Sequence, residues 1–352
     1  MSKIETKIIK VDSENLKEER VREAAKIIKR GGTVAFPTET VYGLGANGLD
    51  ERAVERIFKA KGRPQDNPLI LHIAFKEQLE ELVKDIPEEA FEIMEKFWPG
   101  PLTLIFKKSD KVPDKITGGL STVAIRMPNN KIALKIIELA KVPIAAPSAN
   151  TSGRPSPTNA THVVEDLYGK INMVVDGGST GIGVESTVLD MSGETPMILR
   201  PGGIIYEDLK LLINNVELDK SIIKDNENII PKSPGQKYKH YAPKGKMIVY
   251  SGDVDNVVSN IKALAEKYIK EGKKVGIMAT EETRNRYTIG TVLVVGSREN
   301  KDSIAKNLFN IIREFDNFDV DIILAEGTDT IGIGRAIMNR MKKASGNNVK
   351  WV

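Results

Sequence analysis

Two positively charged side chains on a proline-restrained loop are the sharpest chemical signal in this sequence of 352 residues. Lys61 and Arg63 flank a single glycine, and Pro64 and Pro68 limit the freedom of the chain that follows them. Cations that are held in place suit phosphate or carboxylate groups better than they suit solvent. The alternative interpretation is that Lys61 only ends a helix, where a cation stabilises the helix dipole.

A second loop, rich in hydroxyl and amide side chains, follows a predicted buried strand at 142–146. Ser148, Asn150 and Ser156 lie on this stretch, and prolines restrain its backbone. Small hydroxyl and amide donors at a strand end can hold phosphate oxygens. The alternative is a plain loop of serine and proline residues.

Three further places could carry chemistry. Segment 37–45 follows a predicted strand and reads Pro-Thr-Glu-Thr-Val-Tyr-Gly-Leu-Gly, which suits a small polar ligand or, alternatively, is a turn capped by threonines. Arg200 also follows a predicted strand, and the next residue is a proline, which favours contact with an anion. His72 lies in an alternating strand and is either a site residue or a half-buried structural histidine. His162, at a helix start, is expected to be exposed.

The composition excludes several classes of chemistry. Cysteine is absent, which rules out disulfides, cysteine-ligated zinc, iron–sulfur clusters and thiol nucleophiles. The 3 histidines are far apart in the sequence, so we expect no resident metal site. The sequence signatures of P-loops, α/β-hydrolases and HExxH metalloproteases are missing. Lys plus Arg number 52 and Asp plus Glu 48, and the net charge of +4 argues against a nucleic-acid binder driven by basic tails.

The sequence gives no sign of a membrane partner. No apolar run approaches the roughly 20 residues of a transmembrane helix, and the first residues lack the apolar core of a signal peptide. We therefore expect a cytoplasmic protein.

The hydrophobic periodicity predicts an α/β protein with two domains. Residues 1–207 alternate short strands with helices, which predicts a mixed twisted sheet whose chemistry lies in loops at strand ends. Residues 208–245 lose this periodicity and are expected to form a linker. Residues 246–352 alternate strand and helix more simply, which predicts a smaller Rossmann-like domain with a parallel sheet. The expected strands are 7–11, 33–36, 68–72, 102–106, 122–126, 142–146, 172–176 and 186–190, and then 247–250, 274–278, 291–295 and 321–324.

Taken together, these motifs resemble the YrdC family of threonylcarbamoyl-adenylate synthases. They look most like its two-domain members, which carry a second small α/β domain behind a linker. The combination of Lys-x-Arg at 61–63 and Ser-x-Asn at 148–150, in that order, is the most specific part. The other matching pieces are 37–44, 185–187, 199–202, 233–243 and 332–339, so the resemblance covers the whole chain.

The resemblance implies a reaction in which L-threonine, bicarbonate or CO₂, and ATP give threonylcarbamoyl-AMP and pyrophosphate. Mg²⁺ would arrive with ATP. A separate transferase would then use the adenylate to modify an adenosine next to the anticodon in certain tRNAs. Because both reactants are anionic, the reaction needs cations around the carbamate and the phosphates, and it needs no covalent nucleophile.

The resemblance also implies which residues form the site. The catalytic set is Lys61, Arg63, Ser148 and Asn150. The residues for threonine are Thr38, His72, Arg126, the backbone of Ala146, and Ser186. The residues for ATP are Lys61, Arg63, Asn67, Thr122, Ser148, Asn150, Ser156, Arg200 and Tyr241. Tyr241 would close over the nucleotide as part of a lid at 231–243.

Two other functions compete with the synthase. A related carbamoyl-adenylate enzyme of hydrogenase maturation shares both motifs, but such proteins carry cysteine zinc fingers, which this chain lacks. An RNA-binding module of the same fold is the second, and the small net charge and the lack of interleaved aromatic residues argue against it. Direct tRNA binding, the oligomeric state and a ligand for the C-terminal domain stay open.

Overall fold

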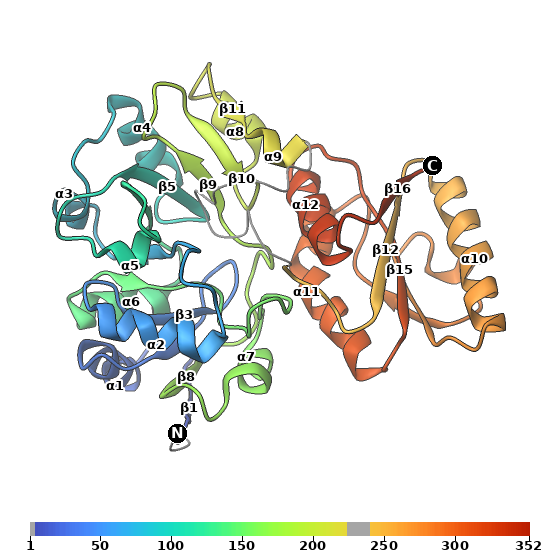
Figure 1. Ribbon diagram of the computed structural model, residues 1–352, viewed down its shortest axis with the longest axis horizontal. Coiled ribbons are helices and arrows are strands. Elements are labelled where there is room, and N and C mark those ends of the chain that lie inside the picture. Colours follow the sequence, from blue (N-terminus) through green and yellow to red (C-terminus); the bar gives the residue numbers. More distant parts are fainter. Residues whose placement is uncertain (1–3, 224–239) are drawn as a thin grey trace. The chain divides into compact units, whose positions relative to one another are not determined.

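The computed structural model describes residues 4–223 and 240–352 and divides the chain into two compact units. The elements carry the labels of Figure 1. The first unit comprises Met1–Ser152, Ser156–Gly181 and Glu185–Tyr238, and the second comprises Gly153–Pro155, Ile182–Val184 and Lys239–Val352.

An eleven-stranded sheet is the framework of the first unit. Its strand order is β1-β8-β2-β3-β7-β4-β6-β5-β9-β10-β11, with parallel and antiparallel pairs side by side, which confirms the predicted mixed sheet. The strands are β1 (Lys7–Lys10), β2 (Val34–Phe36), β3 (Gly43–Asn47), β4 (Ile70–His72), β5 (Leu102–Lys107), β6 (Thr122–Arg126), β7 (Ile144–Ala145), β8 (Met173–Asp176), β9 (Thr187–Asp190), β10 (Met197–Arg200) and β11 (Glu217–Leu218).

Helices bury apolar side chains against this sheet. In α1 the buried residues recur at helical spacing, from Val21 to Ile28, and the helix packs beside α6. The helices are α1 (Glu18–Lys29), α2 (Glu51–Lys61), α3 (Leu79–Leu82), α4 (Glu88–Phe97), α5 (Asp114–Thr117), α6 (Lys131–Ala140), α7 (Ala160–Leu167), α8 (Tyr206–Lys210) and α9 (Lys220–Ile223), with a short 3₁₀ turn η1 (Lys76–Gln78).

Helix α2 carries the first residue of the Lys-x-Arg motif. The side chain of Asp50 caps its start by accepting two backbone N–H groups of the first turn. Val54 and Ile57 lie on its buried face. Gly62 ends the helix in the left-handed region at φ +62°, so the chain turns away directly after Lys61.

Part of segment 37–45, interpreted from the sequence as a ligand-binding stretch or a turn capped by threonines, continues the sheet as strand β3 between β2 and β7. Glycines weaken the strand signal in a sequence, but here they allow close packing. A Cβ atom on Gly45 would lie 2.5 Å from the ring of Phe36, and one on Gly43 would lie 3.3 Å from the Cβ atom of Ala146. Small residues therefore bring this strand against its neighbours.

Residues 208–223 form part of the first unit, whereas the sequence pattern assigned them to the linker. Leu209 and Val216 are buried in its core, and β11 pairs with β10. Residues 224–239 lie outside the described residues, and with them most of the segment 231–243 that is predicted to act as a lid.

The second unit contains a five-stranded parallel sheet with the order β14-β13-β15-β12-β16, which confirms the predicted Rossmann-like domain. Helix α10 covers one face, and α11 and α12 cover the other (Figure 1). The elements are β12 (Lys246–Ser251), α10 (Val254–Lys270), β13 (Val275–Ala279), η2 (Arg284–Arg286), β14 (Thr291–Val294), α11 (Lys301–Asn317), β15 (Ile322–Glu326), α12 (Gly334–Ala344) and β16 (Val349–Trp351). In the described parts of both units, no helix is long and apolar enough to cross a bilayer.

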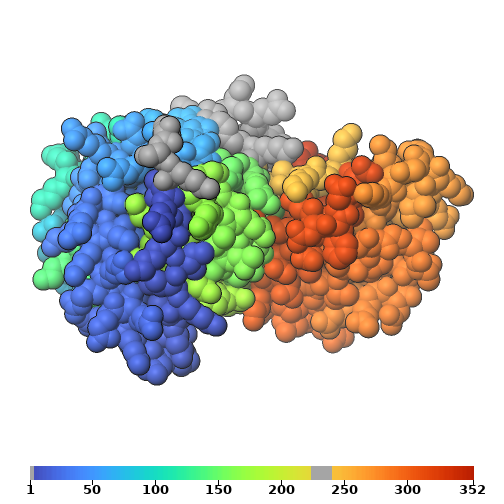
Figure 2. Space-filling model, turned by 90° about the horizontal axis from the view of Figure 1, so that it is seen from below, coloured from blue at the N-terminus to red at the C-terminus, as the bar shows by residue number. Residues whose placement is uncertain are grey.

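The first sheet joins segments that are far apart in the sequence. β1 pairs in parallel with β8, so that Lys7 lies opposite Met173. In Figure 2 the blue surface near the N-terminus adjoins the green surface of later residues of the same unit. Site residues from distant motifs can meet for the same reason.

Candidate active site

One face of the first sheet brings several predicted site residues together. His72 on β4, Arg126 on β6 and Thr103 on β5 lie side by side in register. Because side chains alternate along a strand, the residues two positions away share this face. They form a second, apolar row that consists of Ile70, Ala124 and Ile105.

The residues predicted for ATP gather beyond the apolar row. Thr122 begins β6, about 13 Å along the strand from Arg126 at roughly 3.3 Å per residue. The backbone N–H of Ala146 donates to the carbonyl of Ile70 at 3.0 Å. The chain after β7 therefore runs beside the start of β4, and Ser148 lies there. The residues predicted for threonine and for ATP thus lie mainly at two ends of one strip.

Arg126 forms the charged end of the strip. It is buried, with 4% of its surface exposed, and its Nε donates to the carbonyl of Gly100 at 3.2 Å. Its Nη2 lies 2.7 Å from Oε1 of Glu39, whose side chain is 13% exposed. Sequence reasoning assigned no role to Glu39, although this residue stands between two threonines in the segment 37–45.

His72 is uncharged at physiological pH. Burial and, to a smaller extent, the positive charge of Arg126 lower the pKa of His72 to about 3. Among the described residues, no group forms a hydrogen bond with its Nδ1. A neutral imidazole can donate or accept one hydrogen bond at this atom, depending on its tautomer, which suits a ligand hydroxyl.

Ser186 and Arg200 lie beside the same row. The Oγ of Ser186 is 2.7 Å from Oγ1 of Thr103, and Arg200 donates to the carbonyl and the Oγ of Ser186 at 3.1 Å each. Gly202 lets the two strand ends approach, because a Cβ atom there would lie 2.3 Å from the carbonyl oxygen of Glu185. Arg200, predicted for ATP, therefore lies against a residue predicted for threonine.

Lys61 ties the end of α2 to the Ser-x-Asn loop. Its ammonium group is buried and donates to the carbonyl oxygens of Ser148 at 2.5 Å and of Asn150 at 2.6 Å. Ser148 in turn donates its Oγ hydrogen to Oδ1 of Asn150 at 2.5 Å. The Lys-x-Arg and Ser-x-Asn motifs are therefore in direct contact, and a buried positive charge lies between them.

Arg63 and Asn67 shape the neighbouring loop. The guanidinium of Arg63 donates to the carbonyl oxygen of Pro68 at 3.0 Å and reaches that of Asn67 at 3.4 Å. Asn67 is buried, and its Oδ1 accepts no hydrogen bond from the described residues. The guanidinium of Arg63 on this loop is the kind of donor that phosphate oxygens prefer.

Thr38 and Ser156 are buried with their hydroxyls already engaged. Thr38 donates to the carbonyl of Val41 at 2.6 Å and accepts the N–H of Thr40, so the threonine-capped turn is present. Ser156 donates to Oε1 of Glu185 at 2.5 Å. Both hydroxyls hold the shape of their loops in this state.

Tyr241 belongs to the second unit. Its ring packs on Phe309 with the ring centroids 4.9 Å apart, and the guanidinium of Arg340 lies 5.7 Å from the Tyr241 centroid. It is 5% exposed. Its contact with a nucleotide stays a prediction.

Sequence reasoning missed three polar residues of this region and misplaced one histidine. Glu39, Thr103 and Glu185 pair with predicted site residues, and only Glu39 and Glu185 stand within motifs that were noticed. Thr103 alternates with apolar residues in a strand and gave no signal. His162 was expected to be exposed, but it is buried, with 7% of its surface exposed. Its ring nitrogens face the N–H of Thr158 and the amide of Asn159, at 3.3 Å each.

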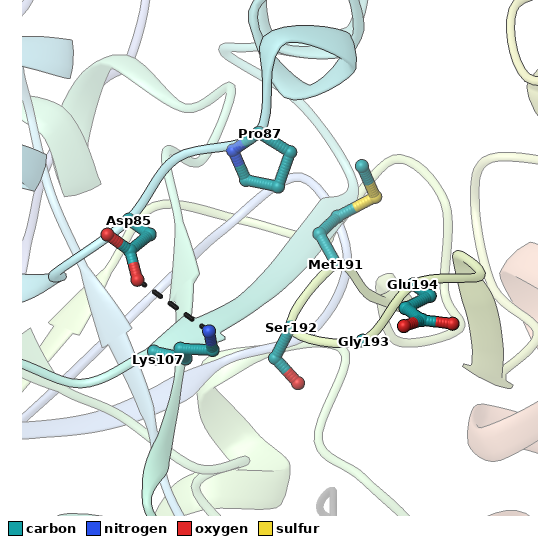
Figure 3. Close-up of a pocket in the computed structure, with 7 residues that line it drawn as sticks. All are labelled: Asp85, Pro87, Lys107, Met191, Ser192, Gly193 and Glu194. Carbon is teal, nitrogen blue, oxygen red and sulfur yellow. Dashed lines mark ion pairs between the residues drawn. The ribbon is translucent and has the colours of Figure 1, made fainter.

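A surface pocket of about 310 Å³ lies at the other ends of β5 and β9 from Thr103 and Ser186 (Figure 3). It contains an exposed ion pair in which Nζ of Lys107 is 3.7 Å from Oδ2 of Asp85. None of its lining residues belongs to the predicted site; they are Asp85, Pro87, Lys107, Met191, Ser192, Gly193 and Glu194. No group of three or more His, Asp or Glu residues in the described chain could hold a metal ion.

The chain matches two known domain families and several characterised sequences. Residues 26–202 match the Sua5, YciO and YrdC domain, described as telomere recombination, and residues 204–346 match the C-terminal domain of threonylcarbamoyl-AMP synthase. The threonylcarbamoyl-AMP synthase of Pyrococcus abyssi is 52% identical, over 96% of this chain and 97% of its own length. The chain belongs to the threonylcarbamoyl-AMP synthase family. The synthase of Bacillus subtilis is 47% identical, with 94% of each chain covered.

A solved structure of this synthase family has the same fold. The crystal structure of Pyrococcus abyssi Sua5 in complex with L-threonine superposes with a TM-score of 0.95 at 52% identity. It covers 99% of this chain and 100% of that chain. The likeness thus extends over both units.

Proposed function

We propose that this chain synthesises threonylcarbamoyl-AMP from L-threonine, bicarbonate or CO₂, and ATP, and releases pyrophosphate. The observation that carries the proposal is the contact of the Lys-x-Arg motif with the Ser-x-Asn motif, on the same strip that ends in Arg126. Relatives named as this synthase at 40–52% identity support it. The related structure with bound L-threonine supports threonine as the amino acid.

The arrangement suits a reaction between two anions. The amine of threonine combines with CO₂ to give a carbamate, and a carbamate oxygen then attacks the α-phosphorus of ATP while pyrophosphate leaves. Arg126 and Arg200 would neutralise the threonine and carbamate end, and Arg63 with the buried charge of Lys61 would neutralise the phosphate end. Catalysis would consist of positioning and electrostatic stabilisation.

ATP would enter as its magnesium complex. The guanidinium of Arg63 and the hydroxyl of Ser148 would then contact its phosphate oxygens. We further propose that the enzyme works in the cytoplasm and passes its adenylate to a separate transferase that modifies tRNA.

The proposal is tested by product analysis with one amino acid at a time. The full chain is incubated with ATP, Mg²⁺, bicarbonate and a single amino acid, and pyrophosphate, AMP adducts and ADP are quantified. Threonine is expected to stimulate pyrophosphate release far more than serine or valine does, and omission of bicarbonate should abolish the effect. ADP and phosphate as the main products would contradict the proposal.

A further inference from the structure

The carboxylate of Glu39 lies buried at the charged end of the strip, and the reaction scheme above leaves it unused. The turn that holds it is rigid, because Thr38 donates to the carbonyl of Val41 at 2.6 Å and accepts two backbone N–H groups. Tyr42, which follows this turn, is buried in the core, and its hydroxyl donates to the carbonyl of Gly178 at 2.6 Å. The carboxylate is therefore directed by the fold.

The ion pair between Glu39 and Arg126 has unused hydrogen-bonding capacity on both sides. Oε1 of Glu39 and Nη2 of Arg126 are 2.7 Å apart, but the two groups are not aligned for a hydrogen bond. Among the described residues, no N–H or O–H group donates to either carboxylate oxygen. Buried polar atoms are nearly always paired, and exceptions call for a reason such as a missing ligand.

A ligand that matches this pair must carry an N–H donor beside a carboxylate. A buried carboxylate accepts hydrogen bonds from an ammonium group, and a neighbouring guanidinium donates to a carboxylate. A free α-amino acid carries both groups on the same carbon atom. Neutral His72, in register with Arg126, could complete the site with a hydrogen bond to a side-chain hydroxyl.

We propose that Glu39 binds the ammonium group of the amino acid substrate, while Arg126 binds its carboxylate. Glu39 is then a specificity-determining residue that selects an amino acid over a hydroxy acid and directs the nitrogen that is to be carboxylated. The inference rests on the proposed function only in taking threonine as that amino acid.

Calorimetric titration without ATP tests this, using the full chain and two ligands. One is L-threonine, and the other is the matching 2,3-dihydroxybutanoate, in which a hydroxyl replaces the amine. Glu39→Gln keeps the shape of the side chain and removes its charge. The variant is expected to bind threonine at least about 30-fold more weakly, in line with a lost charged hydrogen bond, and to bind the hydroxy acid within about twofold of the wild type. Glu55→Gln, an exposed change on α2, serves as the matched control.

Any other result of the titrations overturns the inference. An equal loss of affinity for both ligands would mean that Glu39 only positions Arg126. An unchanged affinity for threonine would mean that the ammonium group binds elsewhere. If the glutamine variant does not fold, Glu39→Asp, which keeps the charge, is tested instead. This variant must still weaken the binding of threonine more than the binding of the hydroxy acid. Wild-type protein that binds threonine but makes no adenylate contradicts the proposed function alone.

Discussion

Arg63 projects from a loop whose position is set by α2 on one side and by two prolines on the other. Its replacement by alanine is expected to lower turnover by roughly 100-fold, because losing a charge partner of a phosphate costs about 2–5 kcal/mol and each 1.4 kcal/mol is about tenfold. Steady-state kinetics with threonine and ATP measure this. Lys59→Ala, an exposed lysine on the same helix, is the control and should change turnover little. An unchanged rate in a folded Arg63→Ala variant would place this guanidinium outside the reaction.

His72 is expected to make the protein less stable in acid. In an unfolded chain a histidine takes up its proton below about pH 6.5, whereas in the fold its pKa is lowered to about 3. Between these values the unfolded state binds more protons. The contribution of His72 to the free energy of unfolding is therefore fully present above about pH 6.5. It falls by up to about 1.4 kcal/mol per pH unit as the pH decreases toward 3.

Urea unfolding of the wild type and of His72→Gln at pH 7 and pH 5 measures this contribution. The wild type should lose about 2 kcal/mol more than the variant between the two conditions. The same loss in both proteins would show that this imidazole is not held neutral by the fold.

At the residue scale, the sequence identifies site residues that stand in a distinctive motif. It does not identify residues, such as Glu39, whose importance depends on a contact with a residue far away in the chain. Lys61 stood out, but its contact with the carbonyls of Ser148 and Asn150 depends on two motifs almost ninety residues apart. Glu39 stood inside a noticed motif, and only the arrangement of the strands shows that Arg126 faces it. Burial of His162 accompanies contacts of its ring nitrogens with Thr158 and Asn159, which its place near a helix start does not report.

At the element scale, the end of α2 depends on one glycine. Gly62 has φ +62°, and a Cβ atom there would meet no heavy atom within 4 Å, so alanine would add backbone strain without a clash. Gly62→Ala is expected to destabilise the protein by about 1–2 kcal/mol and to raise the KM for ATP by misdirecting Arg63. Gly272→Ala, at the end of α10, is the matched control, since its φ is +78° and its surroundings are equally open.

Thermal unfolding and steady-state kinetics of both glycine variants make the comparison. The two proteins should lose similar stability, and only Gly62→Ala should change the KM for ATP. An equal KM in both would mean that this turn does not direct the Lys-x-Arg motif.

Most strands could be predicted, because β-branched and apolar runs mark them. β3 could not, because its glycines weaken the strand pattern. Their close contacts with Phe36 and Ala146 depend on the folded sheet. The mixed order of the first sheet also lies beyond periodicity, since pairs such as β1 with β8 join segments about 165 residues apart.

At the scale of the whole molecule, the end of the first unit has a direct test. A fragment that stops after residue 207 loses three buried side chains, Leu209, Ile213 and Val216, each worth about 1.5–3 kcal/mol on burial. A fragment that stops after Ile223 keeps them. The longer fragment is expected to unfold at a clearly higher temperature, and equal unfolding temperatures would show that residues 208–223 do not belong to the unit. The sequence pattern does not predict residues 208–223 as part of the first unit, because the helices and the strand in this segment are too short to show a periodicity.

The proposed reaction joins threonine, an inorganic carbon and the AMP part of ATP on this one chain. Mass spectrometry of the product made from isotopically labelled bicarbonate and L-threonine tests it most directly, with Arg63→Ala as the matched control. We expect an adduct of AMP that contains the threonine and one labelled carbon, formed together with pyrophosphate and strongly reduced in the variant. An AMP product without the labelled carbon, or ATP cleaved to ADP and phosphate, would contradict it.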